Sequence, residues 1–232
     1  ITLLQGGVEQ DPKSAEAYYL LGMALKGSGR ADEATSAFQR ALKIHKKFVK
    51  PRYELGMLQL ENGQYGEAAA TFQKGIKKKY EPSGSLNYGI GMVKMAQDSM
   101  RAATVYFTRA AQDDPYNPAY FKAMGDIYAR QKVTELAVNE YNSALQLDPN
   151  APDIHYAIGK LYFKDRNWAE VLKAWRTALS VDSTFVPVYA DLIDLYLIMT
   201  PPRYGEAVPL LEKAAEFHPE EPKSKVELAR GM

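Results

Sequence analysis

The chain has 232 residues, of which 46% are hydrophobic and 25% are charged, and its 29 basic and 28 acidic side chains leave a net charge of +1. This is the composition of an ordinary globular protein, and the near-neutral charge with dispersed arginines argues against nucleic acid as a partner. Cysteine is absent, which excludes disulfides and thiol chemistry, and no apolar run approaches the roughly 18 residues of a spanning helix, which argues against direct membrane insertion.

Helical periodicity is clear in the first part of the chain and continues toward its end. Residues 15–26 and 32–44 both carry apolar side chains at the spacing of one helix face. The turn between them contains the helix breakers Gly27-Ser28-Gly29. Further along, Asn62-Gly63 and Asp165-Arg166-Asn167 occupy the corresponding place between two helical stretches. We therefore expect a succession of helix pairs and no strand.

One phrase recurs six times along the chain. It opens with a large apolar residue that is followed, in five copies, by glycine; a small residue, a bulky residue and another small residue then follow at fixed spacing. The opening pairs are Leu21-Gly22, Leu55-Gly56, Ile90-Gly91, Met124-Gly125, Ile158-Gly159 and Leu192-Ile193. The copies are 34 residues apart, with one step of 35 and one of 36. Such a period is typical of a helical solenoid, whose binding surface extends along one face.

The recurring glycine has a predicted packing role. Glycine within a helix costs about 1 kcal/mol relative to alanine, so its recurrence needs a structural reason. We expect it to lie where the two helices of a pair cross most closely, facing the small residue that opens the second helix, as Ala34 would face Gly22.

This pattern resembles the tetratricopeptide repeat (TPR) family. In the first complete copy, the family's motif positions fall on Tyr18, Leu21, Gly22, Ala34, Phe38 and Ala41. The resemblance implies an all-α fold, a right-handed superhelical α-solenoid of antiparallel helix pairs. It divides the chain into residues 1–14, the second helix of a preceding repeat; six repeats at 15–48, 49–83, 84–117, 118–151, 152–185 and 186–221; and 222–232, a partial capping helix.

The sixth repeat departs from the pattern. Ile193 replaces the glycine, and the additional residues 200–203 include two prolines that must end the first helix. Two interpretations stay open: sequence drift in a terminal repeat, or a reshaped end that docks a neighbouring domain or subunit.

Basic residues are concentrated in the first third of the chain. Residues 1–82 hold 13 Lys and Arg against 9 Asp and Glu. The excess gathers at the ends of the second helices, in Lys43, Lys46, Lys47, Lys50 and Lys77-Lys78-Lys79. Lysines there complement the helix macrodipole, which is the interpretation the sequence favours; attraction of an acidic partner is the alternative.

The residues needed for catalysis do not form a recognisable set. His45, His155 and His218 fall in different repeats, without a second ligand at metal spacing. The glycines of the first turn lack the lysine of a phosphate-binding loop. We therefore predict no catalytic residue, no metal site and no cofactor.

The resemblance implies a ligand groove on the concave face, lined by the first helices of the repeats. The positions that usually meet ligands there hold Tyr19, Met23, Tyr53, Met57, Leu60, Tyr88, Met92, Met95, Lys122, Asp126, Tyr156 and Lys160. Tyrosine and methionine in the first part suit varied apolar side chains, whereas the later positions are largely charged. This order fits a protein or peptide segment with an apolar portion. The alternative is that some of the methionines pack between adjacent first helices.

These observations favour a non-catalytic scaffold that binds a peptide or helical segment in the groove. One alternative is the recognition arm of a larger enzyme or of an envelope or secretion assembly, and a chain that begins with Ile1 is expected to be a fragment. Another is self-association through the solenoid ends, since Leu3, Leu4 and Val8 begin the chain without a covering helix. The compartment stays open.

Overall fold

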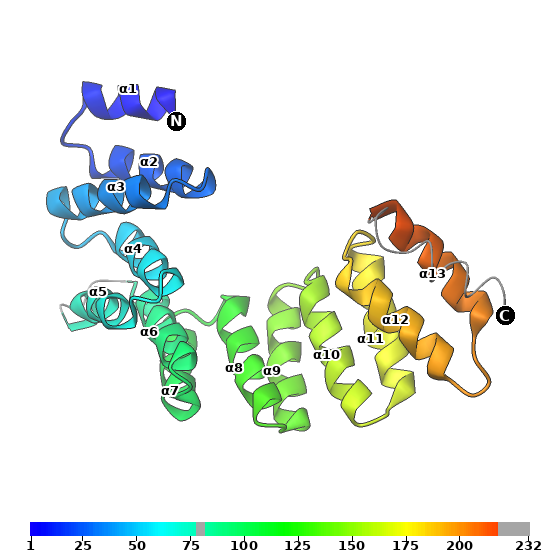
Figure 1. The fold of residues 1–232 in the computed structure, drawn as a ribbon. Coiled ribbons are helices and arrows are strands. Elements are labelled where there is room, and N and C mark those ends of the chain that lie inside the picture. The colour runs from blue at the N-terminus through cyan, green and yellow to red at the C-terminus, as the bar shows by residue number, and fades with distance from the viewer. Residues whose placement is uncertain (78–81, 218–232) are drawn as a thin grey trace. The chain divides into compact units, whose positions relative to one another are not determined.

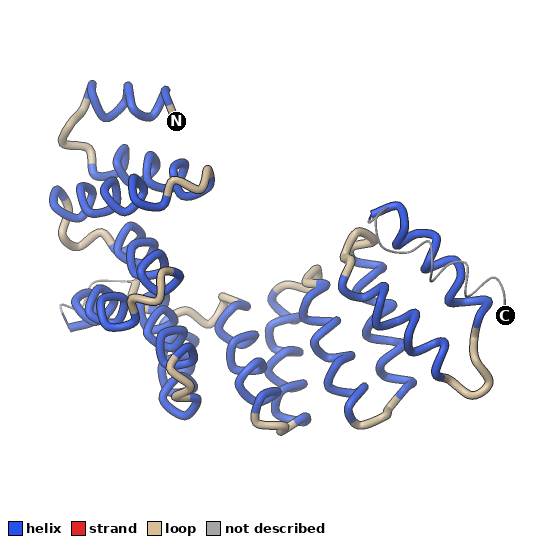
Figure 2. The backbone as a smooth tube through the Cα atoms, viewed as in Figure 1, coloured by secondary structure: helices blue, strands red, loops and turns tan. Residues whose placement is uncertain are grey.

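The structure is a computed structural model that describes residues 1–77 and 82–217. These two ranges form thirteen α-helices and no strand, which confirms the predicted all-α fold (Figures 1 and 2). The helices are α1 (Thr2–Gln10), α2 (Ala15–Gly27), α3 (Ala31–Ile44), α4 (Val49–Glu61), α5 (Tyr65–Lys77), α6 (Gly84–Ala96), α7 (Met100–Asp113), α8 (Pro118–Arg130), α9 (Thr134–Leu147), α10 (Pro152–Lys164), α11 (Trp168–Val181), α12 (Pro187–Ile198) and α13 (Tyr204–Phe217). The capping helix expected at 222–232 lies outside the described residues.

The chain forms two compact units, Ile1–Ile127 and Tyr128–Met232. In the first unit α2 packs on α3, α4 on α5 and α6 on α7, and the first helices α2, α4 and α6 also contact one another in order. In the second unit α10 packs on α11 and α12 on α13. Each unit is thus built from helix pairs joined by short turns, the arrangement that the repeat predicts.

The turns inside the helix pairs share one backbone conformation. At the same place in five of them lies a residue with positive φ: Gly29, Gly63, Asp98, Lys132 and Arg166. The amide of the following residue donates to a carbonyl five residues back, as in Arg30 N to Leu25 O at 2.9 Å and Asn167 N to Tyr162 O at 3.0 Å. This left-handed cap satisfies carbonyls at the end of the first helix and reverses the chain. Only two of the five positions carry the glycine that this conformation favours.

Much of the core is built around a large aromatic ring on the second helix of a pair. Phe38, Phe72, Phe107 and Trp175 are almost completely buried. The predicted role of the recurring glycine is wrong in one respect. A Cβ on Gly22 would meet the ring of Phe38 at 2.5 Å, and the three nearest atoms all belong to that ring. The glycine therefore makes room for the bulky residue of the second helix and not for the small residue that opens it.

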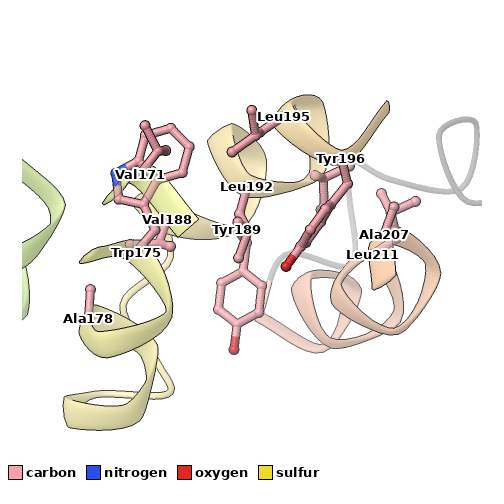
Figure 3. Packing of buried hydrophobic residues seen from close by; sticks show 11 residues of the cluster. Val171, Trp175, Ala178, Val188, Tyr189, Leu192, Leu195, Tyr196, Ala207 and Leu211 are labelled. Carbon is pink, nitrogen blue, oxygen red and sulfur yellow. The ribbon is translucent and has the colours of Figure 1, made fainter. Parts of the chain in front are cut away.

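The second unit ends in a tightly packed apolar cluster despite the irregular sixth repeat. Trp175 of α11, Tyr189 and Leu192 of α12 and Leu211 of α13 lie within it (Figure 3). Ile193, which replaces the glycine, is buried in the same cluster.

The insertion of the sixth repeat is fastened back onto α12. That helix ends at Ile198, ahead of the two prolines. The amide of Arg203 donates to the Tyr196 carbonyl at 2.9 Å. The guanidinium of Arg176 donates to the Tyr196 hydroxyl at 2.7 and 3.0 Å. The insertion is therefore an ordered part of the end of this unit.

Candidate functional site

The predicted groove residues lie on the first helices of both units. They are Tyr19 and Met23 on α2; Tyr53, Met57 and Leu60 on α4; Tyr88, Met92 and Met95 on α6; Lys122 and Asp126 on α8; and Tyr156 and Lys160 on α10. Ten of them belong to the unit Ile1–Ile127 and two to the unit Tyr128–Met232. A single groove that runs through all twelve stays a prediction.

Tyrosines of the first unit are shared between the core and the surface. The Tyr19 ring lies 6.1 Å from that of Phe38, and the Tyr53 ring lies 6.2 Å from that of Phe72. Tyr88 lies between two rings, 5.4 Å from Phe107 and 5.2 Å from Tyr120. Each groove tyrosine is half-buried. It thus covers the core aromatic of its own helix pair with one face and leaves the rest accessible.

Methionines of the first unit are divided in the same way. Met57 and Leu60 pack against the buried cluster around Phe72, whereas Met23 keeps 37% of its surface exposed. Met92 and Met95 are half-buried. Packing between helices, the alternative that the sequence left open, therefore describes Met57 in part, and the thioethers that stay accessible can still adapt to an apolar ligand.

Burial raises the pKa of three phenol groups in this unit. It raises the pKa of Tyr53 and, to about 12, that of the core residue Tyr120. The pKa of Tyr88 is also raised, mainly by burial, although Lys122 acts in the opposite direction. A protonated phenol can donate a hydrogen bond, so the hydroxyls of the half-buried Tyr53 and Tyr88 are suited to the carbonyl groups of a bound segment.

The raised tyrosine pKa values predict a loss of stability at alkaline pH. A phenol whose folded pKa exceeds its unfolded value of about 10 stabilises the fold below that pH, and the contribution is lost as pH rises toward the folded value. We expect urea midpoints to fall between about pH 10 and pH 12, and to fall less in Tyr120→Phe and Tyr53→Phe, which have no proton to lose. Equal losses in the variants and the wild type would contradict this assignment.

Charged residues of the first unit's surface pair with one another. Lys26 on α2 lies 2.7 Å from the Glu54 carboxylate on α4, so a half-buried ion pair connects two consecutive first helices. Lys122 and Asp126 lie one turn apart on α8, with 3.5 Å between the Nζ and a carboxylate oxygen. Exposed pairs of this kind contribute little to stability.

The predicted residues of the second unit converge on one carboxylate. The Tyr156 hydroxyl donates to Asp191 Oδ2 at 2.6 Å, and Lys160 Nζ lies 3.9 Å from the same oxygen. Lys160 also lies 5.3 Å from the centroid of the Tyr156 ring. Burial, and then the hydrogen bond to Asp191, raise the pKa of Tyr156. The α10 and α12 helices are thus connected through these three side chains.

Beside this network lies a cavity of about 240 Å³. Its lining residues are Lys160, Phe163, Lys164, Trp175, Asp191 and Asp194. The Phe163 and Trp175 rings are stacked, with centroids 5.7 Å apart and planes at 22°. The cavity therefore combines an aromatic wall with lysines on α10 and aspartates on α12.

Trp175, which lines this cavity, was not among the predicted residues because it belongs to a second helix. Its ring lies against Gly159, and its Nε1 donates to the Tyr156 carbonyl oxygen at 3.1 Å. The signal in the sequence was a tryptophan where the preceding repeats have phenylalanine or tyrosine, since a larger ring extends further from the same position.

Within residues 1–77 and 82–217, no group of three or more His, Asp or Glu residues is arranged to hold a metal ion. Over the same residues, none of the helices combines the length and the apolar character needed to cross a membrane.

This structure is that of an α-helical repeat protein. It is built from helix pairs with left-handed turns, and aromatic rings of the second helices pack against glycines of the first. Two models described as tetratricopeptide repeat match residues 1–47 and 25–83, and one described as TPR repeat matches residues 125–165. These matches together cover just over half of the chain. The chain belongs to the tetratricopeptide repeat family.

Solved structures with the same fold are numerous but distant in sequence. The Cut9–Hcn1 hetero-tetramer of the APC/C superposes with a TM-score of 0.74 at 16% identity, over 98% of this chain and 45% of that one. PilF of Pseudomonas aeruginosa gives 0.64 at 16% identity, over 78% of this chain and 82% of that one. YrrB, a TPR protein with an unusual peptide-binding site, gives 0.55 at 19% identity, over 81% and 96%. No curated protein matches the chain in sequence.

Proposed function

We propose that this chain is a non-catalytic scaffold that binds a protein segment along its first helices. The observation that carries the proposal is the cavity between α10 and α12, because its lining joins the predicted groove residue Lys160 to Phe163 on the same helix and to Asp194 on the first helix of the next repeat. An aromatic wall with charges on both sides suits one apolar side chain of a segment whose backbone or termini meet the charges. YrrB is a member of the same fold class with a peptide-binding site, and this supports a segment as the ligand class.

The first unit supports the same ligand class with a less polar surface. Half-buried tyrosines supply large rigid area at low entropic cost, and their protonated hydroxyls can donate to a backbone. The accessible methionines on α2 and α6 adapt to different side chains. We propose that this surface binds the more apolar part of the ligand.

One substitution separates the groove from the rest of the surface. Met92 on α6 is half-buried on the proposed binding face, and Val105 on α7 is 50% exposed on the other helix of the same pair. The probes are peptides selected on the wild-type chain from a random phage-displayed library. We expect Met92→Glu to lower the affinity for these peptides by about tenfold or more, because a carboxylate must be desolvated against an apolar side chain. Titration by fluorescence anisotropy measures the effect.

Val105→Glu is the matched control, since it introduces the same charge into the same helix pair. It should leave the affinity nearly unchanged. If both variants bind the selected peptides as the wild type does, the first helices of the first unit are not the binding face. Circular dichroism of both variants checks that the helices persist.

In the alternative function the same groove binds the segment, but the chain is the recognition arm of a larger enzyme or of an envelope or secretion assembly. PilF and the Cut9–Hcn1 tetramer share the fold at 16% identity, which bears on the fold alone. Affinity capture with the chain as bait separates the two: co-purifying subunits of one stable assembly favour the alternative.

A further inference from the structure

A second cavity lies in the first unit, between α3, α4 and α5. None of the residues that line it is a predicted groove residue. It has a volume of about 470 Å³. Its lining residues are Gln39, Leu42, Lys43, Lys46, Arg52, Leu55, Ala70, Thr71 and Lys74. Four of these nine side chains are cationic, and none is acidic. Three neighbouring helices thus bring together charges that are up to 31 positions apart in the sequence.

The helix macrodipole explains only part of this charge. Lys43 lies in the last turn of α3, where a cation is favourable. Arg52 lies in the first turn of α4, the end at which a cation is unfavourable, and only 4% of its surface is exposed. The macrodipole therefore does not account for the position of Arg52.

Local packing holds this arginine in place at the cavity. Its Nη2 donates to the Lys46 carbonyl oxygen at 2.6 Å, which connects the guanidinium to the loop before α4. A Cβ on Gly75 of α5 would come within 3.0 Å of Arg52 Cδ, so the glycine leaves room for the arginine stem. The guanidinium is therefore held against one wall of the cavity, whereas the three lysines are exposed around it.

Apolar atoms form much of the remaining wall. Leu55 of α4 is buried, and Leu42 of α3 is half-buried beside the cavity. Between the charges lies the Thr71 hydroxyl, which donates to Gln59 Oε1 at 2.7 Å. A ligand that matches this lining needs carboxylates or other anions on both sides of an apolar group.

We propose that this cavity is a second binding site, for an acidic peptide segment that carries an apolar side chain between its carboxylates. Charge complementarity selects the anions, since the described residues that line the cavity include four cations and no acid. Among the same described residues none is aromatic, and because single strands bind through aromatic stacking, the apolar wall favours a peptide over a nucleic acid. The exposed ammonium groups of Lys43, Lys46 and Lys74 can pair with the carboxylates.

The test uses a fluorescein-labelled peptide with glutamates on both sides of one leucine, titrated by anisotropy against the whole chain. We expect binding that weakens as salt rises from low to physiological strength. The variant Lys43→Glu with Lys74→Glu should weaken it by about tenfold or more, because two attractions become repulsions. Both lysines are exposed, so the fold should persist.

The matched control is Lys13→Glu with Lys213→Glu, which changes the net charge equally at exposed positions that do not line the cavity. It should change the affinity less than about twofold, since exposed charges that do not contact the ligand are screened. On the probe, replacing glutamate by glutamine or leucine by glycine should weaken binding in each case. Met92→Glu should leave this peptide bound, which keeps the result independent of the proposed groove.

Three results would overturn the proposal. The first is a wild-type chain that does not bind the peptide at low salt. The second is a control variant that loses as much affinity as the cavity variant, which means that the attraction is diffuse. The third is an oligonucleotide, inorganic polyphosphate or an anionic vesicle that binds more tightly than the peptide and displaces it, which assigns the cavity to phosphate groups.

Discussion

Replacing Gly89 by alanine is expected to destabilise the first unit by about 1–3 kcal/mol. The ring of Phe72 lies against two glycines, Gly56 on α4 and Gly89 on α6. A Cβ at Gly89 would lie 2.5 Å from Phe72 Cε1 and Cζ, well inside contact distance. Because Gly56 lies against the same ring atoms, the phenyl ring has little room to move away. Urea denaturation followed by circular dichroism measures the loss.

The control is the same substitution at Gly66, in the first turn of α5, where an added Cβ meets no atom within 4 Å. There alanine should be neutral or stabilising by up to about 1 kcal/mol, since only the helix propensity changes. A double change of Gly89→Ala with Phe72→Leu should cost less than the sum of the two, because the smaller side chain relieves the overlap. Additive losses, or equal effects at Gly66 and Gly89, would mean that Phe72 does not require the glycine.

The helical fold could be predicted from the sequence because the repeat fixes each element several times over. Six copies of one apolar phrase, in register, leave few alternatives for where a helix pair begins and turns. The location of the bulky core residue, Phe38 or Phe72, also follows from that phrase. What the spacing does not give is which atoms fill the space of a missing side chain. The glycine was therefore assigned to the small residue of the partner helix, whereas the ring occupies that space.

The turns illustrate a second limit. Gly29 and Gly63 mark left-handed positions that a reader of the sequence would expect. Asp98, Lys132 and Arg166 adopt the same conformation without glycine, because the hydrogen bonds of the helix ends and the packing of the pair determine the backbone there. A local propensity is thus overridden by the repeat in which it occurs.

The candidate site was predicted less completely than the fold. Groove positions carried over from the family identify the face of each first helix, but they do not say how a side chain divides its surface between core and solvent. Tyr53 and Met57 pack against the cluster around Phe72, and this contact depends on the ring of the next helix. The cavity around Arg52 needs three helices at once, and no spacing within one repeat reveals it.

Replacing Trp175 by alanine should have the largest effect of any single change in the second unit, a loss of about 3–5 kcal/mol. The indole is 1% exposed and contacts the rings of Tyr156 and Phe163. It also forms a wall of the cavity between α10 and α12. Loss of this side chain leaves a large void and removes the hydrogen bond to the Tyr156 carbonyl. A compact unit of this size has only about 5–15 kcal/mol of total stability, so much of it should be lost.

The chain has two tryptophans, so fluorescence of the remaining Trp168 follows unfolding of the second unit directly in the variant. Trp175→Phe is the matched control. It should cost much less, because phenylalanine is accepted at the same place in three other helix pairs, and it removes the indole donor while keeping an aromatic ring beside Phe163. Hydrogen exchange of Trp175→Ala should show lost protection in α10–α13 with α4–α7 retained, since a repeat depends chiefly on its neighbours. If Trp175→Ala costs no more than Trp175→Phe, the ring does not support the core of this unit, and its role is confined to the wall of the cavity.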